Sequence, residues 1–303
     1  MAGRVQQVEQ KLAAIEQFSQ ALANELYEAF GNYLKTLANA VKKQLILASY
    51  HLCTQGYPEA FLGLSLQKKQ ELQGAIRRLT LTAEHEFSVL LPLSLKVEQN
   101  VQNKTENSMA EGEGSEETDK IDESDDVDDG NIDNESEEMM PLASLVLTNP
   151  EQISHWYQKI EQVILEILQT SSRKANSSLQ KYKILPNNLP GVLLESAAKS
   201  SRYAESVGDM PNILNLTIEL GNPEEAEKSR NREAKPKDSI NFWTIQLRLS
   251  DLEFADPLLM AGRNQIRQQS NRLNLMLKEY QAKQQELTIA EAEAAWRSSW
   301  FEE

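Results

Sequence analysis

The first 50 residues carry an unbroken helical repeat of apolar side chains, and this repeat limits the folds open to the chain. Twelve apolar residues from Val5 to Leu45 are separated by eleven steps that average about 3.6 residues, the period of a straight α-helix. The segment from Val5 to about Leu52 contains no proline, and Gly31 is its only glycine. A helix of this length is on the order of 70 Å long. Its apolar stripe therefore needs an equally long partner.

A second long helix is predicted at the other end of the chain, from Asp256-Pro257 to about Trp300. Apolar residues recur along it at intervals of seven, at Ile266, Leu273, Tyr280, Leu287 and Ala294. The positions between them include the polar residues Ser270, Gln284 and Glu291, so the apolar seam is incomplete. We expect the N- and C-terminal helices to pack against each other, and the incomplete seam also suggests self-association.

The middle of the chain predicts two further helices and one hairpin. Helices are expected from Ser65 to about Ser88 and from Asn149-Pro150 to about Tyr182, with a short one over 192–204. Apolar and polar residues alternate over 214–220 and again over 243–249, which is typical of half-buried strands. The polar stretch between them predicts a β-hairpin over about 212–249 with a long loop.

An acidic insert separates the two helical regions. Between Thr105 and Met140 the sequence has 16 acidic residues and a single basic one, Lys120, which leaves 30 acidic and 30 basic residues elsewhere. Because such a segment buries too little apolar surface to offset chain entropy, we expect residues 99–141 to be disordered. The predicted organisation is thus a helical region 1–98, a disordered acidic linker 99–141, and a helical region 142–303 that contains the hairpin.

The predicted fold class is mainly α, with long amphipathic helices packed as a bundle or coiled-coil-like pair, one β-hairpin and the acidic insert. Outside the insert the charges balance, which argues against a nucleic-acid-binding protein. Cys53 is the only cysteine, so no intramolecular disulfide forms and a reducing compartment is expected. The first 20 residues lack the apolar core of a secretion signal, and no run approaches about 18 apolar residues. We therefore expect a cytoplasmic protein with no transmembrane segment.

Sequence motifs for catalysis are absent. The chain has no P-loop, GxGxxG, GxSxG or HExxH pattern, and its three histidines, His51, His85 and His155, lie in unrelated surroundings. We therefore predict no catalytic residue, no cofactor and no metal site.

Two groups of residues are candidates for binding. The first is a basic surface that only Glu195 interrupts, formed by Arg173, Lys174, Lys181, Lys183, Lys199 and Arg202. It is either an ordinary solvated surface or a site for an anionic partner. The second is the aromatic C-terminus with Trp296, Trp300 and Phe301, which either packs on the protein itself or anchors a partner.

The segments Leu247–Pro257 and Thr288–Trp300 resemble a family of conserved cyanobacterial proteins to which no activity is assigned. The resemblance covers roughly the last 60 residues of the chain. It implies a bacterial cytoplasm, and it transfers no functional residue.

These observations favour a non-enzymatic interaction or scaffold protein that self-associates and carries an acidic regulatory arm. One alternative is a peripheral membrane-surface protein, because long amphipathic helices also lie on bilayers. The other is an enzyme whose active site is assembled from residues distant in sequence.

Overall fold

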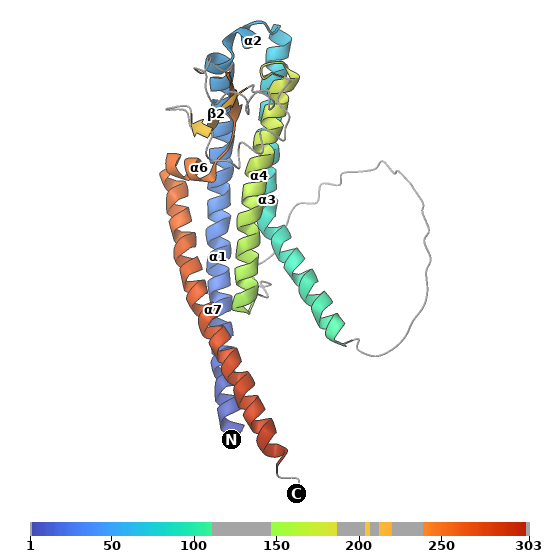
Figure 1. The fold of residues 1–303 in the computed structure, drawn as a ribbon, viewed down its shortest axis with the longest axis vertical. Coiled ribbons are helices and arrows are strands. Elements are labelled where there is room, and N and C mark those ends of the chain that lie inside the picture. Colours follow the sequence, from blue (N-terminus) through green and yellow to red (C-terminus); the bar gives the residue numbers. More distant parts are fainter. Residues whose placement is uncertain (1, 111–146, 187–203, 207–211, 220–238, 301–303) are drawn as a thin grey trace, which may run out of the picture. The chain divides into compact units, whose positions relative to one another are not determined.

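The computed structural model describes residues 2–110, 147–186, 204–206, 212–219 and 239–300 (Figure 1). Long helices dominate these residues and one antiparallel hairpin accompanies them, which confirms the predicted mainly α fold class. The chain divides into two compact units. Unit 1 comprises residues 1–24, 93–156 and 276–303, and unit 2 comprises residues 25–92 and 157–275. Each unit therefore combines segments from both sides of the acidic insert.

The N-terminal repeat forms helix α1 (Ala2–His51), as its periodicity predicts. Most of the repeat is buried, including Leu22, Leu26, Phe30 and Leu45, but Phe18 is 68% exposed and its neighbour Ser19 is buried instead. The helix continues into a π-helical turn, η1 (Leu52–Gly56), which the Tyr57 amide closes by donating to the Leu52 carbonyl at 2.7 Å. Helix α2 (Pro58–Leu62) follows, with proline in its first turn.

Helix α3 (Leu66–Ala110) begins after Ser65 and is much longer than the sequence predicts. Its expected end lies near Ser88, but the helical backbone continues past Pro92 to Ala110. The additional turns begin with the short apolar run Leu90–Leu95, whose secondary structure the sequence leaves open, and Leu90 and Leu91 are buried. Residues 99–110 of the predicted linker are thus helical, and the remaining part, 111–141, lies outside the described residues.

Helices α4 (Pro150–Lys181) and α7 (Pro257–Ser298) begin where the sequence predicts. The Asn149 side chain accepts a 2.8 Å hydrogen bond from the Glu151 amide. The Asp256 carboxylate accepts one of 2.9 Å from the Leu258 amide. In both helices a side-chain cap precedes a proline in the first turn, where its missing N–H costs nothing.

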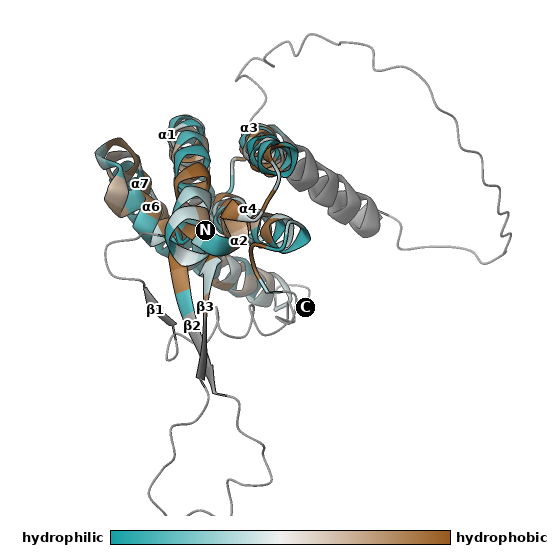
Figure 2. Cartoon of the chain, turned by 90° about the horizontal axis from the view of Figure 1, so that it is seen from above, coloured by the Kyte–Doolittle hydropathy of each residue, from teal (hydrophilic) through white to brown (hydrophobic). Residues whose placement is uncertain are grey.

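The four long helices meet in a bundle within unit 2. The Lys42 ammonium of α1 lies 3.4 Å from the Glu84 carboxylate of α3. The rings of Phe30 in α1 and Tyr157 in α4 have centroids 5.7 Å apart. Helix α7 joins the bundle at the Arg263 cluster described below. Seen from above, the coloured parts of the long helices show both hydrophobic and hydrophilic residues, as expected of amphipathic helices (Figure 2).

Strands β1 (Ala204–Ser206), β2 (Ile213–Glu219) and β3 (Ser239–Ile245) form an antiparallel sheet in the order β1-β2-β3. The pairing of β2 and β3 runs from Ile213 opposite Ile245 to Glu219 opposite Ser239, which confirms the predicted hairpin. Strand β1 differs from the prediction, because the sequence predicts a short helix over 192–204 and Ala204 begins a strand instead. The rest of that predicted helix and the hairpin loop, 220–238, lie outside the described residues.

Side chains from the helical part of unit 2 cover the outer edge of β3 near its C-terminal end. The amides of Trp243, Ile245 and Leu247 donate 2.9 Å hydrogen bonds to the Tyr57 hydroxyl, the Asn176 side-chain carbonyl and the Ser172 hydroxyl, respectively. Amides two residues apart in an extended chain point to the same edge. The strand ends at Ile245, and Leu249 already begins helix α6 (Leu249–Ala255). The alternation that predicts a strand up to Leu249 therefore extends beyond the real one.

Candidate functional site

Both candidate tryptophans lie exposed at the end of α7. The Trp296 side chain is 66% exposed and that of Trp300 is 70% exposed. Their ring centroids are 5.7 Å apart with the planes tilted by 51°, so the two rings contact each other. Phe301, the third predicted member, lies outside the described residues. The structure thus leaves both described tryptophans available to a partner.

Ile289 is an exposed apolar residue on the same side of α7 as the aromatic pair. Residues 289, 296 and 300 are separated by seven and four positions, which places them on one side of the helix. Ile289 is 48% exposed, so all three residues reach solvent. We call Ile289, Trp296 and Trp300 the α7 terminal face. Glu293 lies on the same side of the helix between Ile289 and Trp296, where it pairs with Arg297 at 3.8 Å, whereas Glu291 lies on the opposite side.

Contacts with α1 fix this end of α7 within unit 1. The Arg4 guanidinium donates to the Glu293 carboxylate at 3.2 Å. Further along, the Ser19 hydroxyl lies 2.9 Å from the Met276 sulfur. The Tyr280 hydroxyl donates to the Glu16 carboxylate at 3.3 Å, and burial raises the pKa of this tyrosine. The predicted packing of the N- and C-terminal helices is therefore present within a single chain.

The heptad seam of α7 is buried over only part of its length. Ile266, Leu273 and Tyr280 are buried, Leu287 is half-buried and Ala294 is exposed. The exposed apolar residues Ile289 and Trp296 in the last turns of α7 therefore lie outside the predicted seam.

Four of the six predicted basic residues lie at the end of α4 in unit 2. Arg173, Lys174, Lys181 and Lys183 are all exposed, whereas Lys199 and Arg202 lie outside the described residues. Lys174 pairs with Glu86 of α3 at 3.4 Å. The exposed positions make this surface accessible to an anionic partner, but the structure gives no geometry that singles one out.

Lys183 has an unusual backbone conformation. Its φ of 60° lies in the left-handed region, which glycine normally occupies at the end of a helix. The Ile184 amide donates to the Leu179 carbonyl and the Lys183 amide donates to the Gln180 carbonyl, the hydrogen-bond pattern of a Schellman motif. This motif ends α4 and directs the Lys183 side chain away from a regular helical position.

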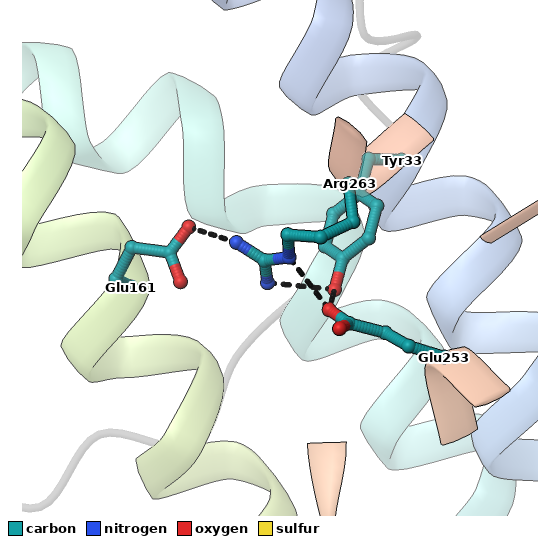
Figure 3. A network of polar contacts seen from close by, with 4 residues as sticks. All are labelled: Tyr33, Glu161, Glu253 and Arg263. Carbon is teal, nitrogen blue, oxygen red and sulfur yellow. Dashed lines mark hydrogen bonds and ion pairs between the residues drawn. The ribbon is translucent and has the colours of Figure 1, made fainter. Parts of the chain in front are cut away.

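A buried ion cluster, which the sequence analysis misses, joins four helices of unit 2 (Figure 3). Tyr33 belongs to α1, Glu161 to α4, Glu253 to α6 and Arg263 to α7. Arg263 is only 5% exposed. Its Nε donates to Glu253 at 2.6 Å, its Nη2 donates to the Tyr33 hydroxyl at 2.7 Å, and its Nη1 donates to Glu161.

The Arg263 cluster is internally satisfied. The Tyr33 hydroxyl donates to Glu253 at 2.7 Å while it accepts from Arg263, and the guanidinium carbon lies 4.6 Å from the centroid of the Tyr33 ring. Burial raises the pKa of Tyr33. Gly262 permits this approach, because a Cβ there would lie 3.3 Å from the Tyr33 ring. The cluster therefore connects four helices. All four of its side chains form hydrogen bonds with one another.

The described residues contain no group of three or more His, Cys, Asp or Glu side chains arranged to hold a metal ion. None of the described helices is both long and apolar enough to cross a membrane. Comparison of the chain with profiles of known protein families, with curated protein sequences and with solved structures gives no match.

Proposed function

We propose that this protein is a non-enzymatic scaffold that binds a partner protein through the α7 terminal face. The observation that carries the proposal is the exposure of Trp296, in the last turn of α7, and of Trp300, in the turn that follows, at a helix end that contacts α1 through Arg4 and Glu293. Tryptophan is enriched among the residues that dominate binding energy at interfaces. A rigid helix also presents these side chains without the ordering cost of a free tail.

The charges beside the α7 terminal face favour a protein over a lipid surface. Glu293 lies on the face between Ile289 and Trp296, and the two cations that contact it, Arg4 and Arg297, are both paired with its carboxylate. Membrane-binding helices instead typically carry rows of Lys and Arg that are available to anionic headgroups. The expected partner therefore offers an apolar groove, and a second copy of this chain is one such candidate.

The proposal is tested by comparing three forms of the immobilised full-length protein in binding experiments with native cell extract. The wild type and Phe254→Ala should retain the same partner, whereas Trp296→Ala combined with Trp300→Ala should lose it. Phe254 is a suitable control because it is an aromatic residue that is 82% exposed in unit 2. Circular dichroism should show the same helix content in all three forms. Equal retention by the double variant would overturn the proposal.

Two further measurements identify the class of partner. Sedimentation velocity of the purified protein should give a mass above 34.3 kDa if the partner is a second copy. Flotation with vesicles tests the membrane alternative. Binding to vesicles that depends on Trp296 and Trp300, without a protein partner, would replace the scaffold proposal.

A further inference from the structure

A pocket lies in unit 2 where the end of α1, the turn η1, helix α2 and the start of α3 meet. We call it the α1–α3 pocket. Its volume is about 410 Å³, within the range of 300 to 1,000 Å³ typical of small-molecule sites. Its walls are mainly apolar and include Ile46, Tyr50, Phe61, Leu72 and Ile76.

Arg77 is the only charged side chain among the described residues that line the pocket, and it is exposed. The Lys69 ammonium adds a second positive charge nearby, 5.3 Å from the centroid of the Phe61 ring. An apolar cavity with a guanidinium in its lining and an ammonium beside its wall is complementary to a ligand with an apolar body and an anionic head.

The wall of the pocket includes an irregular turn. Cys53 and Thr54 line it, and both belong to the π-helical turn η1. Such turns are rare, and when they occur inside helices they are frequent at functional sites. Cys53 is also the only cysteine of the chain, so its thiol reports on the pocket alone.

We propose that the α1–α3 pocket binds a long-chain carboxylate, with the alkyl chain among Ile46, Phe61 and Leu72 and the carboxylate at Arg77. This site is separate from the α7 terminal face and does not depend on the scaffold function. A guanidinium recognises a carboxylate through charge-assisted hydrogen bonds, which a neutral or cationic head does not accept. The ligand class is therefore defined by its charge as well as by its chain.

The test uses dodecanoate below its micellar concentration as the probe and the modification of Cys53 by N-ethylmaleimide as the readout. Intact-mass spectrometry follows the reaction, and circular dichroism verifies that the protein stays folded. Dodecanoate should slow the modification at least about fivefold in a saturable manner, because a bound chain covers the thiol. Dodecyltrimethylammonium at the same concentration should not slow it.

Two variants isolate the role of Arg77. Arg77→Gln should raise the half-protecting concentration of dodecanoate by about tenfold, the equivalent of about 1.4 kcal/mol. Arg78→Gln removes the same charge one position further along α3, outside the pocket lining, and should leave that concentration unchanged. Equal effects of the two variants, equal protection by the cationic amphiphile, or no protection of the folded protein by dodecanoate would each overturn the proposal.

Discussion

Asn176 of α4 and Ile245 of β3 exchange two hydrogen bonds of 2.9 Å each, so a side-chain amide stands where a neighbouring strand would otherwise pair. The amide group of asparagine has the same donor and acceptor as a peptide group, which makes this replacement geometrically complete. The contact attaches the hairpin of unit 2 to the helical bundle.

Replacement of Asn176 should remove the contact between β3 and helix α4 at Ile245. Asn176→Leu leaves the Ile245 N–H and C=O without partners in a buried environment, and we expect the free energy of unfolding to fall by about 2–4 kcal/mol. Urea denaturation measures the change. Ser178→Ala, two residues along the same helix, removes an exposed hydroxyl that bonds only within α4 and should change stability by less than about 0.5 kcal/mol. Equal stability of both variants would contradict the bridging role of Asn176.

Disruption of the Arg263 cluster should lower the free energy of unfolding by more than the loss of Asn176 does. Arg263→Met leaves Glu161 and Glu253 without their shared cation, and removal of one partner from a buried ion pair typically costs about 3–5 kcal/mol. Arg263→Lys keeps the charge but loses the forked geometry and should fall between this variant and the wild type. Arg267→Met, at an exposed position one turn further along α7, is the matched control for thermal or urea unfolding. If Arg263→Met lowered the free energy of unfolding by less than about 1 kcal/mol, the cluster would contribute little to stability.

Cys53 predicts a dependence on alkaline pH. Burial raises the pKa of its thiol to about 11, so the thiol stays protonated in the folded chain where an exposed one already ionises. The corresponding stability is fully present below pH 9.0 and is lost as the pH rises to about 11. Because the thiolate is the reactive form, alkylation of the folded protein should accelerate up to about pH 11.

The matched control for this prediction is Thr54→Cys in a Cys53→Ser background, because Thr54 is the exposed neighbour in η1. Its alkylation rate should level off near pH 8.5, the ordinary range of a cysteine. The same pH profile for both thiols would contradict the burial of Cys53.

Lys183 predicts a stabilising substitution. A side chain in the left-handed region costs roughly 1 kcal/mol, so Lys183→Gly should raise the free energy of unfolding by about this amount. Ser177→Gly, inside the regular part of α4, should lower it by about 0.5 kcal/mol. Opposite signs in thermal unfolding confirm the conformational cause. A loss of stability with Lys183→Gly would show that the lysine side chain compensates for its backbone.

The charge of the acidic insert predicts an effect on polyanion binding. We expect deletion of 111–140 to tighten heparin binding at low salt, because a tethered acidic arm competes for the basic surface of α4. Each exposed contact is worth about 0–1 kcal/mol and is screened within ~8 Å at physiological salt, so the difference should fade as salt rises. Arg173→Ala with Lys174→Ala should abolish most of the gain, whereas Arg267→Ala with Lys278→Ala should preserve it. If the deletion variant and the full-length protein bound heparin equally well, the insert would serve only as a linker.

The helices were predictable wherever one local signal acts alone. The repeat from Val5 to Leu45 has a single period over its whole length, and the caps Asn149 and Asp256 need only the residues that follow them. The same logic fails for α3 beyond Ser88, because the apolar run Leu90–Leu95 has no clear period and contains Pro92, which normally disfavours a helix interior.

Features that depend on distant residues could not be predicted. Tyr33 and Arg263 are 230 positions apart, and no local pattern marks them as partners. The alternation around Leu247 is a true strand signal, but the partner strand stops at Asn212, which has a φ of 63° and whose side chain accepts from the Arg248 amide. The exposed tryptophans were recognisable as candidates from their spacing. The choice between self-packing and exposure needed the contacts of α1 with the end of α7.

The covered edge of β3 has a consequence for the behaviour of many copies at high concentration. A bare strand edge is a template on which another chain can add its own strand, and growth in this way leads to fibrous aggregates. Tyr57 and Asn176 occupy the donors of Trp243 and Ile245, and Ser172 occupies that of Leu247 just beyond the strand. An incoming strand finds no available amide at these three residues, so the hydrogen bonds that attach the hairpin to the helices also oppose strand addition at this end of β3.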